Sequence, residues 1–144
     1  MNTSRKTFEI KDRKVILSTL WIFAVLNYLY ADVFGGKDPE AVKQLISGTV
    51  GSIQMTEGFL LGAAILMETS IAMVLLSRVL KYGANRWANI IVGIINTAAV
   101  SLSLFATGIT PTLYYMFFAA IEIPCTLFII WYAWKWPNPE DQPK

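Results

Sequence analysis

Apolar residues are concentrated in four long runs along this chain of 144 residues, with short polar or Gly- and Pro-containing stretches between them. The runs cover residues 15–34, 52–77, 88–108 and 112–134. At a rise of about 1.5 Å per residue, a helix over each run spans most or all of a hydrocarbon core about 30 Å thick. The pattern therefore predicts an all-α fold, a transmembrane four-helix bundle formed by residues 15–134.

Polar segments flank this predicted domain. Residues 1–14 form a basic arm, and residues 135–144 form a proline-rich tail that we expect to be exposed and irregular. A basic arm before an apolar run is also typical of a signal peptide, but no A-x-A cleavage pattern follows Tyr30. We therefore expect the first span to be retained as a helix.

The segment 35–51 predicts a short amphipathic helix between the first two spans. Asp38 and Pro39 suit the N-cap and the first helical position, and Gly48 suits the end. Such a helix either lies on the membrane surface or folds as a lid over the mouth of the bundle.

The basic residues predict the orientation of the chain. With both termini in the cytoplasm, ten of the 12 Lys and Arg residues lie inside, in the N-terminal arm, the 78–87 connection and the tail. Only Lys37 and Lys43 then lie outside. Since cytoplasmic loops are enriched in Lys and Arg, we expect a multi-pass protein of the cell inner (plasma) membrane with both termini cytoplasmic.

Composition narrows the chemistry. Hydrophobic residues make up 55% of the chain, and the net charge of +2 is too small to indicate nucleic-acid binding. There is no His and only one Cys, Cys125, which excludes an internal disulfide, a Cys/His zinc site and His-dependent nucleophilic catalysis. We expect no metal and no cofactor. The expected partner of the chain is membrane lipid, which surrounds its four spans.

Two carboxylates lie within the second apolar run. Glu57 and Glu68 are 11 positions apart, very nearly three helical turns, so they project from one face about 16 Å apart. Because carboxylates at membrane depth usually face a bundle interior, we expect this face to point inward.

Every other span also carries a strong polar residue near its middle. These residues are Asn27, Asn96 and Glu122 in the first, third and fourth spans. An outer layer would add the carboxylate Asp32 and the phenols Tyr28 and Tyr115. We predict a ligand or proton site from Glu57, Glu68, Glu122, Asn27, Asn96, Asp32, Tyr28 and Tyr115.

Four carboxylates thus enter the membrane region or its outer edge, whereas no Lys or Arg does. Buried carboxylates without a counter-charge cannot all remain ionised. They are either protonated and hydrogen-bonded between helices, or alternate between two charge states as in a proton relay, or face a bound cation.

Three short motifs carry a family resemblance: LNYLYADV at 26–33, MTEGFLLG at 55–62, and the segment from Glu122 to Pro124. With the four spans, they resemble the small bacterial membrane proteins of the DoxX-like type, many of unknown function. A more distant similarity is to four-helix EXPERA-type proteins, which use buried acids for sterol isomerisation or for binding cationic amphiphiles. This chain lacks the His of such isomerases, so the resemblance implies only an acidic, lipid-accessible cavity.

Three functions remain open on these observations. The first is binding or transport of a small cationic or amphiphilic ligand, or of protons, with Glu68 and Glu122 as the charge-switching pair. Because one four-span chain encloses little volume, a transporter would need to form a homodimer. The second is a membrane-embedded enzyme using paired carboxylates on a lipid-soluble substrate. The third is a structural or accessory subunit with neutral, hydrogen-bonded acids.

Overall fold

The computed structural model describes the backbone of residues 2–106 and 110–137 and the side chains of residues 12–105 and 110–137. Five helices account for most of the chain: α1 (Asn2–Gly35), α2 (Pro39–Ser47), α3 (Glu57–Val79), α4 (Tyr82–Ala106) and α5 (Leu113–Trp134). Four of them, all except α2, are long and apolar enough to cross a membrane. The predicted all-α transmembrane bundle with a short helix after the first span is confirmed.

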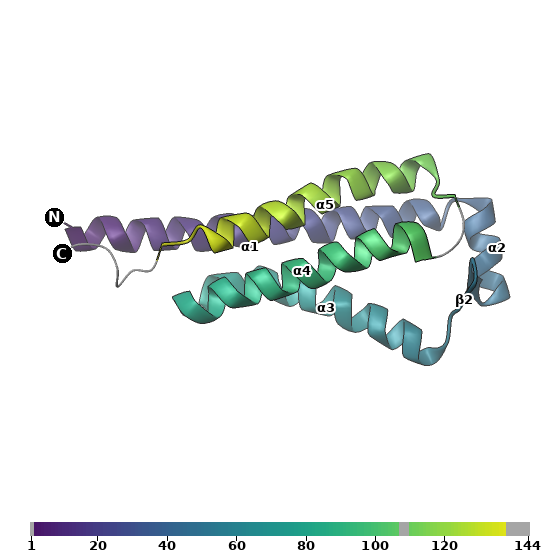
Figure 1. Ribbon diagram of the computed structural model, residues 1–144, viewed down its shortest axis with the longest axis horizontal. Helices are drawn as coiled ribbons and strands as arrows, with labels where there is room; N and C mark the ends of the chain where they lie inside the picture. Colours follow the sequence, from purple (N-terminus) through teal and green to yellow (C-terminus); the bar gives the residue numbers. More distant parts are fainter. Residues whose placement is uncertain (1, 107–109, 138–144) are drawn as a thin grey trace.

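The four long helices run along one axis, with α2 at one end and the start of α1 and the end of α5 at the other (Figure 1). Helix α5 packs against α1 and α4, and α3 packs mainly against α1. Contact between α3 and α4 is much less extensive, and Figure 1 shows α3 diverging from α4 toward the end that carries α2. The bundle is therefore closed near the chain ends and open near α2.

The core is built at the closed end. Leu17, Trp21, Met73, Ile129 and Ala133 are fully or almost fully buried there. In α3 the only buried residues are Ser70, Met73 and Ser77, and every side chain from Glu57 to Ile65 is exposed.

The segment between α1 and α3 forms as its local sequence predicts. The Asp38 side chain accepts a hydrogen bond from the backbone N–H of Glu40 at 3.0 Å, and Pro39 begins α2. Gly48 ends it with φ 72°, a left-handed conformation that glycine adopts without strain. A two-residue antiparallel pair that we did not predict follows, β1 (Thr49–Val50) with β2 (Ile53–Gln54).

No residue of α2 is buried, and its main contacts are with β1. Its apolar side chains Leu45 and Ile46 are 52% and 83% exposed. The bundle does not cover this apolar side, which favours a position on the membrane surface over a lid.

Several boundaries differ from those predicted. The basic arm is not separate from the first span, because residues 2–14 continue into the span as one helix without a Gly or Pro break. Helix α4 begins at Tyr82, inside the predicted 78–87 connection, since its polar first turns are stabilised by hydrogen bonds within the bundle. The predicted end of the third span, residue 108, and the tail from 138 lie outside the described residues.

The start of the tail is not exposed as predicted. Trp136 is 2% exposed, and its ring meets that of Tyr82 edge-on at 5.3 Å between centroids. The Tyr82 hydroxyl also donates to the carbonyl of Trp136 at 2.9 Å. This contact fastens the chain after α5 to the start of α4.

Candidate functional site

Residues of α5 at spacings of three and four form a seam with the antiparallel helix α1. Two contacts bracket Glu122 along this seam. Toward the closed end, Cys125 Sγ lies 3.7 Å from the carbonyl oxygen of Leu20. Toward the open end, the rings of Phe118 and Phe34 lie 5.9 Å apart between centroids. Glu122 is therefore held opposite the part of α1 that contains Tyr28.

Glu122 is 5% exposed, and its Oε1 is buried with no hydrogen-bond partner among the described residues. The hydroxyl of Tyr28 is also buried and also has no hydrogen-bond partner among the described residues. The two groups are close enough to interact electrostatically. A buried polar atom without a partner costs about 1–3 kcal/mol, so two of them in one place form an unusual arrangement.

Two further predicted residues surround this pair on the side toward α2. Asp32 is exposed at the open end of α1 and interacts electrostatically with Glu122. Tyr115 lies seven residues, about two turns, before Glu122 in α5, and it shares a hydrogen bond of 2.6 Å with Ser103 of α4. The structure thus brings together Glu122, Tyr28, Asp32 and Tyr115, with the acid of Asp32 nearest the surface.

The two predicted amides have partners within the chain. Asn96 is 3% exposed, accepts from Ser70 at 2.8 Å and donates to the carbonyl of Val92 at 2.9 Å. It thereby joins α3 to α4. Asn27 donates to the carbonyl of Phe23 in its own helix at 2.9 Å. A ligand-binding role for either amide stays a prediction.

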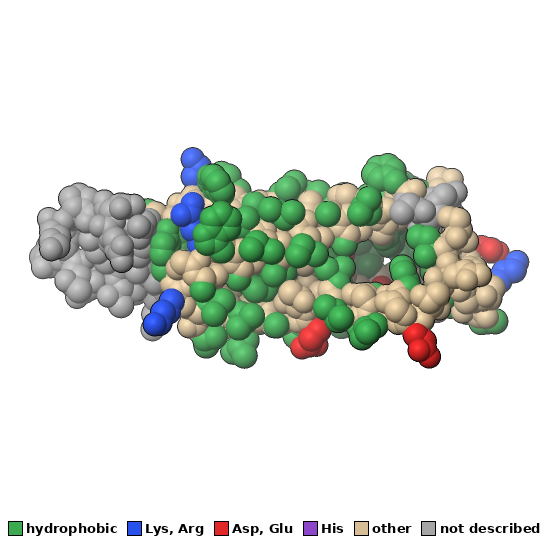
Figure 2. All heavy atoms as spheres, turned by 60° about the horizontal axis from the view of Figure 1, so that its bottom comes forward, with side chains coloured by type: hydrophobic (Ala, Val, Ile, Leu, Met, Phe, Trp, Pro, Cys, Tyr) green, Lys and Arg blue, Asp and Glu red, His purple; other side chains and the backbone are tan. Residues whose placement is uncertain are grey.

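The expected inward orientation of Glu57 and Glu68 is wrong for the single chain. Both carboxylates are exposed, and Figure 2 shows acidic side chains projecting from a surface covered by apolar ones. Glu68 points away from the buried face of α3, which carries Ser70, Met73 and Ser77. Since α3 makes its main contacts with α1 and α4 rather than α5, Glu68 and Glu122 do not face a shared space.

A second polar cluster, at the closed end, was not predicted. The Asn89 carbonyl oxygen accepts from the indole N–H of Trp21 at 2.7 Å and from the hydroxyl of Ser77 at 3.2 Å. Its amide donates to Asn85 Oδ1 at 2.7 Å, and Asn85 donates to the carbonyl of Ser77 at 2.6 Å. All four side chains are fully buried and bonded. The four-residue spacing of the two asparagines is the signal in the sequence, but Asn85 falls within the predicted 78–87 connection.

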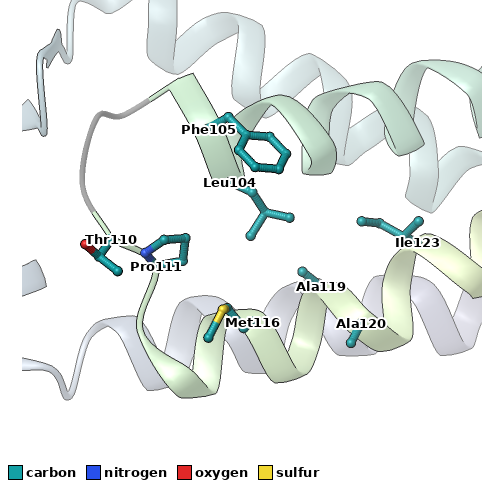
Figure 3. Close-up of a pocket in the computed structure, with 8 residues that line it drawn as sticks. All are labelled: Leu104, Phe105, Thr110, Pro111, Met116, Ala119, Ala120 and Ile123. Carbon is teal, nitrogen blue, oxygen red and sulfur yellow. The ribbon is translucent and has the colours of Figure 1, made fainter.

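An apolar groove of about 670 Å³ lies between the open ends of α4 and α5. Figure 3 shows Leu104 and Phe105 of α4 facing α5 across it, with Pro111 near the connection. The α5 side includes Ala120, whose carbonyl lacks its usual helical donor because Pro124 has no N–H. Glu122 does not line this groove.

No group of three or more His, Cys, Asp or Glu side chains is arranged for a metal ion within the described ranges. The reactive groups around Glu122 are therefore two carboxyls, two phenols and the thiol of Cys125.

Comparison with known families matches nearly the whole chain to one family. The model of a family of unknown function, DUF6326, matches residues 5–142. The chain belongs to this family. No curated protein and no solved structure was found to match it. Membership in DUF6326 fits the expectation of an uncharacterised type of protein, whereas the more specific DoxX-like resemblance finds no support.

Proposed function

We propose that this multi-pass membrane protein binds a small cationic or amphiphilic ligand, or protons, at Glu122. The observation that carries the proposal is the buried Oε1 of Glu122, left without a hydrogen-bond partner beside the equally unpaired hydroxyl of Tyr28. A cation or a hydrogen-bond donor placed between them would remove the cost of both.

The rest of the protein argues against packing as the only role of Glu122. In the Asn85–Asn89 cluster every buried polar side chain has a partner, as expected of polar groups that stabilise the packing. Glu122 is also buried, but its Oε1 has no hydrogen-bond partner among the described residues. Intramembrane acids that face a bundle interior commonly mark ligand or proton sites.

The open end of the bundle offers the route of access. Asp32 lies exposed on the α2 side of Glu122, whereas Leu17, Trp21 and Ile129 close the opposite side. An approaching cation would meet the Asp32 carboxylate first and then Glu122. The phenols of Tyr28 and Tyr115 would supply aromatic and hydroxyl contacts along this route.

The enzyme alternative depended on Glu68 and Glu122 acting together, and the exposed position of Glu68 removes that pairing. We therefore favour binding or transport over paired-carboxylate catalysis. We also propose the plasma membrane as the location, with both termini cytoplasmic and α2 outside, on the strength of the ten-to-two distribution of basic residues.

The test is binding of tetraphenylphosphonium, a lipophilic cation, to the purified protein in lipid nanodiscs. Glu122→Gln removes the buried acid, and Glu68→Gln is the matched control because it removes an acid at mid-span that points outward. We expect Glu122→Gln to weaken binding at least about tenfold, which corresponds to about 1.4 kcal/mol, and Glu68→Gln to leave it unchanged.

The proton form of the proposal has its own readout. Infrared difference spectra recorded while the pH is raised through the neutral range should contain a carboxylic acid band that is absent in Glu122→Gln and retained in Glu68→Gln. If Glu122→Gln changes neither cation binding nor the spectrum, Glu122 is not a binding site and the proposal is wrong.

A further inference from the structure

The outward face of α3 is distinguished by an acid at its centre. Glu68 lies 11 residues from Glu57 and 11 from Val79, the two ends of α3, and it is exposed. No hydrogen-bond partner for its carboxyl occurs among the described side chains and backbone. Apolar side chains on this face are well solvated by lipid tails, but a charged group at the centre of a span is costly.

Helical geometry places a continuous stripe on the same side as Glu68. Going along α3, this stripe contains Leu61, Ala64, Glu68, Ile71 and Leu75, at alternating spacings of three and four. All five side chains are exposed, and Leu61 and Leu75 are 62% and 65% exposed. This spacing is the one by which two parallel helices pack at about +20°.

We infer that the stripe Leu61–Ala64–Glu68–Ile71–Leu75 is a homodimer interface, in which α3 of one copy packs against α3 of a second copy. The inference does not rest on the proposed site at Glu122, because the stripe lies on the opposite face of α3 from its buried residues and does not include Glu122.

A second copy fits this face better than another partner for two reasons. Copies inserted in the same orientation are related by a two-fold axis along the membrane normal, so Glu68 meets its own counterpart at equal depth. A protonated carboxyl carries both a donor and an acceptor, so two carboxyls that share one or two protons bond to each other. Lipid tails offer neither group.

The side chains around Glu68 permit this approach. Ala64 lies one turn away on the stripe, and small residues let membrane helices come close. Glu57 lies about 16 Å from Glu68, at the end of the helix where water is available, so the two copies of Glu57 need not be buried.

Disulfide cross-linking in membranes tests the interface. In a Cys125→Ser background, Ala64→Cys and Leu75→Cys place a thiol on the stripe, and Ile94→Cys places one on the exposed face of α4 as a control. Oxidation with copper phenanthroline at low protein density should give dimers with both stripe variants and none with the control. Yields equal to the control, or ladders beyond dimers, would overturn the inference.

Two substitutions at the centre then test the role of the acid. Glu68→Gln keeps a self-complementary donor and acceptor and should retain the dimer. Glu68→Leu removes both and should raise the dimer dissociation constant about three- to thirtyfold, measured by energy transfer between labelled copies in vesicles. A Glu68→Leu variant that dimerises as tightly as the wild type contradicts this pairing, and native unfolding curves of both variants exclude a folding defect as the cause.

Discussion

At the scale of single residues, one amide joins three helices. Asn89 of α4 accepts from Trp21 of α1 and from Ser77 of α3, and it donates within its own helix to Asn85. Its removal would leave several fully buried polar groups without partners. Asn27 gives the contrast, since its amide bonds only to a carbonyl of its own helix.

We therefore expect Asn89→Ala to lower the free energy of unfolding by roughly 1–3 kcal/mol. Asn27→Ala should lower it by less than about 0.5 kcal/mol, because no contact between helices is lost. Unfolding in mixed micelles, followed by helical circular dichroism, measures both. Equal losses for the two variants would show that the Asn89 cluster does not stabilise the bundle.

The two tyrosines near Glu122 allow a second comparison. The Tyr115 hydroxyl shares a hydrogen bond with Ser103, whereas the Tyr28 hydroxyl is buried without a partner. Tyr115→Phe should cost about 1 kcal/mol of stability, and Tyr28→Phe should cost none, since it removes an unsatisfied group.

Tyr28→Phe should nevertheless weaken tetraphenylphosphonium binding if this hydroxyl faces the bound ligand. Unfolding and binding measured on the same preparations separate the two effects. A large loss of stability in Tyr28→Phe would mean that its hydroxyl has a structural partner in the membrane.

At the scale of elements, α4 and α5 approach closely at Gly93. A Cβ atom at this position would lie 2.7 Å from Cγ1 of Ile130, closer than side chains tolerate. Beside this contact, the hydroxyl of Thr97 donates to that of Thr126 at 2.7 Å. The absence of a side chain at Gly93 therefore sets the spacing of the two helices.

Gly93→Ala should destabilise the protein by about 1–3 kcal/mol through overpacking. Gly62→Ala is the control, because nothing lies within 4 Å of a Cβ built there; it should be neutral or slightly stabilising. Combining Gly93→Ala with Ile130→Ala should cost less than the sum of the single changes. Additive losses would argue against a direct contact.

Prediction from sequence succeeded for elements determined by local chemistry. The limits of α2 follow from Asp38, Pro39 and Gly48, and each acts within a few residues of its own position. The existence of the four spans follows from the length and apolarity of the runs. The inner face of α3 could not be predicted, because the sequence of this helix is apolar on nearly every side. The rule that intramembrane acids face inward selected the wrong face. Only packing against α1 and α4 shows that Ser70 and Ser77 define the buried face.

The candidate site was predictable in part for the same reason. Glu122, Tyr28, Asp32 and Tyr115 each lie in a span that the apolar pattern identifies, so the helix that carries each of them was predictable. Their proximity depends on the antiparallel register of two helices that are far apart in sequence. Spacing within one helix contains no information on that register.

At the scale of the whole molecule, the two ends of the bundle differ in charge as well as in packing. The closed end carries basic side chains that bond to helix ends or aromatic rings there. Lys14 donates to the carbonyl of Leu80 at 2.6 Å, and the guanidinium of Arg86 lies 5.6 Å from the ring centroid of Trp134. The open end carries α2 and only two basic residues, Lys37 and Lys43. This asymmetry predicts that the closed end faces the cytoplasm.

Labelling of single cysteines by a membrane-impermeant maleimide tests this orientation. In the Cys125→Ser background, Glu40→Cys lies on α2 and Lys81→Cys lies between α3 and α4, and both positions are exposed. Glu40→Cys should be labelled in intact cells stripped of any outer barrier, and Lys81→Cys only after the membrane is permeabilised. The reverse result would place the open end, with Asp32 and the route to Glu122, on the cytoplasmic side. If Glu122 binds a cation or proton as proposed, the experiment then also determines from which side of the membrane that ligand enters.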